Sequence, residues 1–122
     1  MKSKMLGAAL CVFLLGGVAA EAATLRVVVV QTSDAAAYVK SVQDGQALLK
    51  SKGSPATLRV WKARFAGTDA GAIAVAVEYP NLEALAKDTE RMASDPELRA
   101  WLQGLDKLRK IVSDSIYEEL GK

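Results

Sequence analysis

The segments TLRVWKARFA (residues 57–66), GTDAG (67–71) and AIAVAVEY (72–79) follow one another in the middle of this 122-residue chain. The first and third segments alternate with the two-residue period of β-strands. Gly67 and Gly71, in the short segment between them, can adopt the positive φ values that a tight reversal needs. The stretch therefore predicts a β-hairpin with strands over residues 57–66 and 72–79.

The hydrophobic pattern of the hairpin also predicts how its two strands pair. We expect these pairs opposite one another on one face: Phe65 and Ile73, Ala63 and Val75, Trp61 and Val77, and Arg59 and Tyr79. The other face then carries Leu58, Val60, Lys62, Arg64, Ala74, Ala76 and Glu78. A slip by one residue would place Lys62 and Arg64 among the large apolar side chains, which is costly. Because both faces carry apolar residues, we expect both to be covered.

The flanking segments predict two more strands and two helical regions. TLRVVVVQT (24–32) contains four consecutive valines, which favour a central strand buried on both faces. Residues 34–52 have helical apolar spacing, with Ser33 or Asp34 as the cap and Gly53 as the stop. Asn81 caps a second helical region, which restarts at Asp95-Pro96-Glu97 and runs to 108. RKIVSDSIYEEL (109–120) predicts a last strand, at an edge of the sheet.

The order of these elements is β-α-β-β-α-β, which predicts an α+β protein with the ferredoxin-like fold. In that fold both helices cover one face of an antiparallel sheet. The other face is apolar here and would be uncovered in a monomer. Exposed apolar faces on the order of several hundred Å² are normally interfaces, so we expect two copies to pack their sheets into a barrel.

The N-terminal residues have the layout of a secretory signal peptide. Two lysines precede an apolar run over 5–20, and the small-residue tract Ala19-Ala20-Glu21-Ala22-Ala23 follows. Cleavage fits after Ala22 or after Ala20. The alternative is an uncleaved membrane anchor, but the run is shorter than the about 20 residues that a spanning helix needs. We therefore predict a signal peptide over 1–22, a single domain over 23–122, and a periplasmic or secreted protein without a stable membrane anchor.

Composition excludes several kinds of site. The only cysteine, Cys11, would leave with the signal peptide, and the chain contains no histidine. Removing 1–22 takes away two lysines and one glutamate, which leaves 14 basic and 13 acidic residues. These charges are interleaved, so nothing indicates a nucleic-acid partner. The sequence also lacks the spacing of a calcium loop and a glycine-rich phosphate loop.

The segments AVAVEYP (74–80), NLEAL (81–85) and SDPE (94–97) resemble the dimeric α+β barrel superfamily. That group includes the antibiotic-biosynthesis monooxygenase-like and NIPSNAP-like proteins. The resemblance covers nearly all of 23–122 and implies a homodimer with a small-molecule pocket between the helices and the sheet of each subunit.

The family's functional residues carry over only in part. Its cofactor-free oxygenases typically use a tryptophan at the end of the third strand, an asparagine on the first strand and a histidine near the second helix. This chain has Glu78 and Gln31 at the first two positions, and it has no histidine for the third or for a haem ligand. We accordingly expect no cofactor and no metal, and the resemblance leaves the catalytic residues unassigned.

Five residues are candidates for ligand binding. Lys62, Arg64 and Glu78 share a face of the predicted hairpin, which looks toward the helices if the superfamily orientation holds. There they would orient a polar group on an apolar or aromatic ligand, and burial would let Glu78 act as a base. The alternative is a cross-strand ion-pair cluster at the surface. Gln31 is the fourth candidate. Trp101 is the fifth, although its spacing, like that of Trp61, also fits a core position.

Three hypotheses follow. The first is an exported homodimer that binds a small, largely apolar ligand, with no reaction assigned. The second is a cofactor-independent monooxygenase-like enzyme built around Gln31, Glu78 and a tryptophan. The third is a structural or assembly protein whose barrel is packed solid. A cavity between the helices and the sheet favours the first two over the third.

Overall fold

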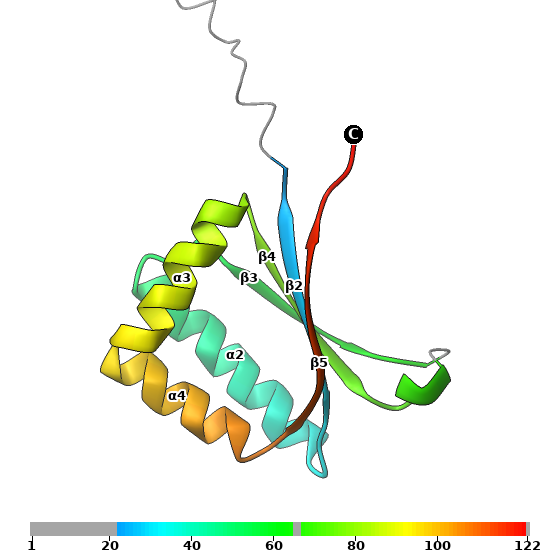
Figure 1. Ribbon diagram of the computed structural model, residues 1–122. Coiled ribbons are helices and arrows are strands. Elements are labelled where there is room, and N and C mark those ends of the chain that lie inside the picture. Colours follow the sequence, from blue (N-terminus) through cyan, green and yellow to red (C-terminus); the bar gives the residue numbers. More distant parts are fainter. Residues whose placement is uncertain (1–21, 65–66, 122) are drawn as a thin grey trace, which may run out of the picture.

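A computed structural model of the chain describes residues 22–64 and 67–121 (Figure 1). It is built from four strands, three α-helices and a short 3-10 turn, η2. In chain order these are β2 (Thr24–Gln31), α2 (Ala35–Ser51), β3 (Thr57–Lys62), η2 (Gly67–Asp69), β4 (Ile73–Tyr79), α3 (Leu82–Ser94), α4 (Pro96–Asp106) and β5 (Lys110–Glu118). The predicted β-α-β-β-α-β order is confirmed, with the second helical region split into α3 and α4.

The four strands form one antiparallel sheet in the order β3-β4-β2-β5. The three helices lie together on one side of this sheet, and no described element covers its other side (Figure 1). This is the ferredoxin-like α+β fold that the sequence predicts. The valine-rich strand β2 is central, and β5 is an edge strand, as expected.

Side-chain caps begin all three helices. Asp34 Oδ1 accepts a hydrogen bond of 3.0 Å from the Ala37 amide at the start of α2. Asn81 Oδ1 accepts one of 2.8 Å from the third residue of α3. Asp95 Oδ1 accepts hydrogen bonds from the amides of Glu97 and Leu98, so it both ends α3 and begins α4. Each cap satisfies amides that have no partner inside the helix, which is why the helices begin where the sequence predicts.

The predicted hairpin register is wrong by three residues. Val60 lies opposite Val75, and Trp61 lies opposite Ala74 instead of Val77. Because the shift is an odd number of residues, the faces of β3 are exchanged relative to those of β4. Leu58 therefore packs with Val75 and Val77 on the side of the helices. Trp61, which the sequence assigns to the core, is 57% exposed on the other side.

The core lies between the sheet and the helices. Its main cluster consists of Val28, Val30, Tyr38, Val42, Ile73, Val75 and Leu105, with Leu58, Val60, Val77, Trp101, Leu102 and Leu108 packed against it. Along β2, Val28 and Val30 belong to this cluster, whereas Val27 and Val29 are half-buried on the opposite face. The sequence predicts burial of this strand on both faces, but only the face toward the helices is fully buried.

Some predictions concern residues outside the described ranges. Residues 1–21 of the predicted signal peptide 1–22, including Cys11, are among these, as are Phe65 and Ala66 of the predicted hairpin. Across residues 22–64 and 67–121, no helix is both long enough and apolar enough to cross a membrane.

Candidate functional site

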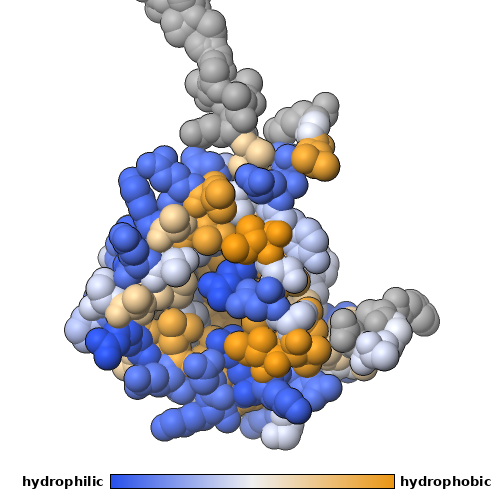
Figure 2. All heavy atoms as spheres, viewed as in Figure 1, coloured by the Kyte–Doolittle hydropathy of each residue, from blue (hydrophilic) through white to orange (hydrophobic). Residues whose placement is uncertain are grey.

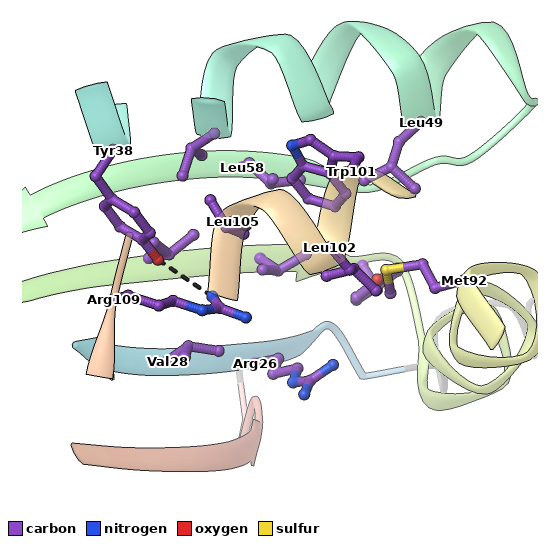
Figure 3. A pocket seen from close by; sticks show the side chains of 14 residues that line it. Arg26, Val28, Tyr38, Leu49, Leu58, Met92, Trp101, Leu102, Leu105 and Arg109 are labelled. Atoms are coloured by element: carbon purple, nitrogen blue, oxygen red, sulfur yellow. Dashed lines mark hydrogen bonds between the residues drawn. The ribbon is translucent and has the colours of Figure 1, made fainter. Parts of the chain in front are cut away.

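The helices and the sheet enclose a pocket next to the main core. It contains about 70 Å³ of space open to the centre of a water-sized sphere, which is enough for several water molecules. Figure 3 shows side chains from the helices and the strands converging on this space. The lining residues are Arg26, Val28, Tyr38, Val42, Leu49, Leu58, Val75, Val77, Tyr79, Met92, Trp101, Leu102, Leu105 and Arg109. Ten of these fourteen lining positions carry valine, leucine, methionine or tryptophan, so the walls are mainly apolar.

Trp101 occupies its position in the wall because a glycine of the neighbouring helix leaves room for it. A Cβ atom on Gly45 of α2 would lie 1.9 Å from Cζ2 of the Trp101 indole. The indole nitrogen donates a hydrogen bond of 2.8 Å to the Ser41 carbonyl of the same helix. These two contacts fix the position of the ring beside α2, where the indole forms part of the pocket wall (Figure 3).

Tyr38 and Arg109 form the polar end of the pocket. Tyr38 is fully buried, and its hydroxyl oxygen accepts a hydrogen bond of 3.2 Å from Arg109 Nη1 (Figure 3). Arg109 also donates Nε and Nη2 to Asp106 Oδ1, at 3.0 and 2.8 Å. The Arg109 side chain is 10% exposed and that of Asp106 is 60% exposed, so the guanidinium lies inward and its counter-ion outward.

Arg26, on the central strand, is the second cation in the pocket wall. Its Nε and Nη2 bind the two carboxylate oxygens of Asp114 on β5, at 2.9 and 2.6 Å. This two-point hydrogen bond raises the pKa of Arg26 and lowers that of Asp114. The Arg109 charge also lowers the pKa of Asp114, which places both guanidinium groups within electrostatic range of the same carboxylate.

A buried carboxylate lies behind the pocket. Asp88 of α3 is fully buried and accepts hydrogen bonds from the Ser54 hydroxyl and from Arg91. Burial raises the pKa of the Tyr79 hydroxyl above its ordinary value, and the neighbouring Asp88 charge raises it further. This cluster joins α3 to the segment between α2 and β3 through the Ser54 hydroxyl and places the Asp88 charge beside the Tyr79 phenol of β4.

The pocket lies near the β5 edge of the sheet, which the helices leave uncovered. The strand β5 is exposed along nearly its whole length, so neither of its faces is covered by the described residues. Figure 2 shows apolar surface on both sides of a group of hydrophilic side chains in this region. A shallow groove there is lined by Arg26, Leu85, Thr89, Asp114 and Ile116. Arg26 lines both the groove and the pocket, so a molecule could approach the pocket from this side.

The five residues that the sequence nominates do not come together. Trp101 lines the pocket. Glu78 is exposed on the opposite face of the sheet, where its carboxylate lies 4.0 Å from the Arg59 guanidinium across the strand pair. The prediction that Glu78 shares a face with Lys62 and looks toward the helices is therefore wrong, because the register of the hairpin differs from the predicted one.

The other nominated residues lie at the ends of strands or just beyond them. Gln31 ends β2 and is exposed, and Lys62 ends β3 and is exposed. Arg64 follows the end of β3 and is also exposed. None of these three lines the pocket.

Sequence reasoning missed the two arginines that line the pocket, Arg26 and Arg109. Arg26 interrupts the apolar pattern on the face of β2 that also carries Val28 and Val30. Every second residue of a strand lies on the same face, so the sequence already places Arg26 on the face of Val28 and Val30. An arginine among core valines is the signal that could have identified it as a pocket residue. For Tyr38, on the apolar stripe of the predicted helix over 34–52, the sequence indicates pocket lining at most, and the structure places it in the pocket wall. Nothing local distinguishes Arg109 from a surface arginine before β5.

The described residues contain no group of three or more aspartate, glutamate, histidine or cysteine side chains that could hold a metal ion. Asp106 and Asp114 are each bound to one of the two arginines that line the pocket. The chemistry of the pocket wall is thus apolar contact together with hydrogen-bond donation from tyrosine and arginine.

Two solved structures share this architecture. One comes from Agrobacterium tumefaciens strain C58 and has 14% sequence identity and a TM-score of 0.58, with 82% of this chain and 93% of that chain covered. It is a NIPSNAP family protein. The protein described here shares the fold of this NIPSNAP family protein, which confirms the predicted ferredoxin-like α+β fold and the predicted resemblance to NIPSNAP-like proteins.

The second structure with the NIPSNAP fold is a conserved protein of unknown function from Bacteroides thetaiotaomicron VPI-5482, described as a possible oxidoreductase. It has 11% identity and a TM-score of 0.56, with 81% of this chain and 98% of that chain covered. No protein-family model matches the chain. Its sequence also has no significant match among curated proteins. At such low identities the likeness establishes the fold alone.

Proposed function

We propose that this protein is exported and acts as a homodimer that binds a small, largely apolar molecule between the helices and the sheet. The observation that carries the proposal is the pocket beside the main core, whose wall is mostly aliphatic and includes the Trp101 indole. Concave, mainly apolar pockets with a few polar groups are the usual form of small-molecule sites. A barrel packed solid would not leave this space, so the pocket weighs against a purely structural role.

Binding is a better supported function than catalysis. Glu78, the residue nominated as a base, is on the face of the sheet opposite the helices, and Gln31 is at the exposed end of β2, so neither reaches the pocket. The oxygenase hypothesis now rests on Trp101 and on the likeness to a protein described as a possible oxidoreductase. Oxygen consumption with an electron-rich phenol, abolished by Trp101→Phe, would support this second candidate function.

The uncovered face of the sheet supports the homodimer. Residues opposite one another in the register share a face, so Leu25, Val27 and Val29 of β2 lie on the same face as Ala74 and Ala76 of β4. We call this surface the far face; it also carries Trp61, 57% exposed, and Tyr117, 56% exposed. Large aromatic and aliphatic side chains of this kind form the centre of protein interfaces. A second copy offers a surface of the same chemistry.

Export follows from the sequence alone. The basic start, the apolar run and the small-residue tract together form a signal peptide. The intact mass of the protein purified from the periplasm or medium tests it. A protein that begins at Ala23 or Glu21 is expected, and one that retains its first 20 residues would contradict export by cleavage.

The ligand pocket is tested by calorimetric titration with octanol, a small apolar probe. Leu102 of α4 lines the pocket and is half-buried, whereas its neighbour Gln103 is exposed. Leu102→Trp should fill the space and abolish octanol binding, while the matched variant Gln103→Trp should bind as the wild type does. Equal binding by the wild type and Leu102→Trp would contradict the assignment of this pocket.

A further inference from the structure

We propose that the molecule bound in this pocket has an apolar body and a single anionic oxygen head, of the carboxylate type. This inference rests on the proposed function and specifies the ligand class for the same pocket. It follows from an inventory of the hydrogen-bond donors and acceptors that face the space.

The first donor is the Tyr38 hydroxyl. A phenol can accept hydrogen bonds and can donate one. Here the oxygen accepts from Arg109 Nη1, at 3.2 Å, so its own proton is available for a further acceptor. Tyr38 is fully buried and lines the pocket, and among the described residues no acceptor is found for this proton. Leaving a buried donor without an acceptor is costly, so a ligand oxygen here would remove that cost.

The second donor is the guanidinium of Arg26. Its Nε and Nη2 are bound to Asp114, and within the described part of the chain no hydrogen bond involves Nη1. Because Arg26 also lines the pocket, this remaining NH₂ group can donate to a ligand.

The remaining polar groups of the wall are also donors or are already occupied. Trp101 donates its only N–H to the Ser41 carbonyl, and Tyr79 lies against the Asp88 charge. Apart from the hydroxyl oxygens of Tyr38 and Tyr79, no acceptor side-chain oxygen lines the pocket. A ligand group that must itself donate hydrogen bonds, such as an ammonium, would find no carboxylate or amide oxygen in the wall and would lie beside two guanidinium groups.

The charges favour an anionic acceptor over a neutral one. Both guanidinium groups line the pocket, whereas Asp106 and Asp114 do not. The Arg109 side chain is 10% exposed and that of its partner Asp106 is 60% exposed, so water screens this carboxylate more than the cation. Arg26 and Asp114 are exposed to similar extents, 32% and 36%, so their charges largely cancel. The positive field in the pocket therefore comes mainly from Arg109, and hydrogen bonds from arginine to an anion are about twice as strong as neutral ones.

Three probes of equal chain length test this inference at pH 7: octanoate, octanol and octylamine. Binding is measured by titration calorimetry, with a check that each variant unfolds as cooperatively as the wild type. Octanoate should bind about tenfold more tightly than octanol, the gain expected from one charge-assisted hydrogen bond, and octylamine should bind most weakly. Tyr38→Phe and Arg26→Gln should each weaken octanoate binding several-fold and octanol binding by a smaller factor, because hydrogen bonds to a neutral oxygen are weaker.

Arg59→Gln is the matched control, because Arg59 is an exposed arginine that pairs with a carboxylate on the far face of the sheet. It should change neither affinity. Equal affinity for octanoate and octanol, or equal octanoate affinity in all three variants, would overturn the anionic head while leaving the apolar pocket in place. If none of the three probes binds, the proposed function fails together with this inference.

Discussion

The contact between Gly45 and Trp101 allows a sharp test of the pocket wall by one added methyl group. In Gly45→Ala, the new Cβ would lie 1.9 Å from Cζ2 and 2.2 Å from Cε2 of the indole. Ordinary contact begins at 3.4 Å, so the ring would have to move by more than an ångström. Such a shift would break the 2.8 Å hydrogen bond from the indole to the Ser41 carbonyl.

The expected change in stability is the balance of three effects. Overpacking of a close contact costs about 1–3 kcal/mol. Loss of the indole hydrogen bond costs about 1 kcal/mol. Alanine is about 1 kcal/mol more favourable than glycine inside a helix, which offsets one of these losses. We therefore expect Gly45→Ala to lower the free energy of unfolding by about 1–3 kcal/mol, or Tm by about 4–8 °C per kcal/mol.

Gly104→Ala is the matched control. Gly104 lies in α4, and an added Cβ would meet nothing within 4 Å. The same substitution there should raise stability by up to about 1 kcal/mol. Urea unfolding followed by circular dichroism gives both values. If Gly45→Ala stabilises the protein as Gly104→Ala does, Trp101 does not occupy the position described. In a Trp101→Leu background the cost of Gly45→Ala should shrink, since the ring is then absent.

Three further predictions concern the buried carboxylate, the strand β5 and the far face. Asp88→Ala should lower the free energy of unfolding by about 1–3 kcal/mol in urea titrations, because it leaves the buried Ser54 hydroxyl without its acceptor and the partly exposed Arg91 without its buried anion; a near-neutral result would contradict the buried cluster. The pKa of Asp114 is lowered by Arg26, so the ion pair stabilises the folded state above the ordinary pKa of 3.8, and this stabilisation is lost as the pH falls through the lower pKa of the folded state. In Asp114→Asn the free energy of unfolding should therefore fall less between pH 5 and pH 3 than in the wild type, by about 1 kcal/mol or less because the pair is partly exposed. An unchanged acid profile would contradict this role of Asp114. Trp61→Lys should weaken dimer formation at least about tenfold in analytical ultracentrifugation, and an unchanged dimer would exclude the far face as the interface.

Element order and helix boundaries could be predicted from the sequence because their signals are local. Asn81 and Asp95 cap their helices through side-chain oxygens that reach amides two or three residues away. The four valines place β2 at the centre of the sheet, because an apolar strand needs neighbours on both edges.

The hairpin register could not be predicted, because both strands carry apolar residues on both faces. The predicted pairing matched Trp61 with Val77 by size, whereas the helices select Leu58 and Val60 as the inward side chains of β3. The predicted penalty for placing Arg64 inward does not arise, because β3 ends at Lys62. Local alternation is therefore consistent with both registers, and long-range packing decides between them.

The site was predicted less well than the fold for the same reason. Of the five nominated residues, only Trp101 lines the pocket. In the observed register Glu78 lies on the far face and no longer shares a face with Lys62. Arg26 and Arg109 are close together in space but separated by most of the chain. They meet Tyr38 in the pocket wall only because α2 and α4 pack on the sheet, and no local sequence pattern predicts that packing.

The most direct test of the central claim uses the consecutive valines of β2, whose side chains alternate between the pocket and the far face. Methyl-labelled protein is titrated with octanol, and the valine methyl signals are followed by two-dimensional NMR. The account predicts shifts for Val28 and Val75, which line the pocket, and none for Val27 and Val29 on the far face. Shifts confined to Val27 and Val29, or no shifts at all, would contradict a ligand site between the helices and the sheet.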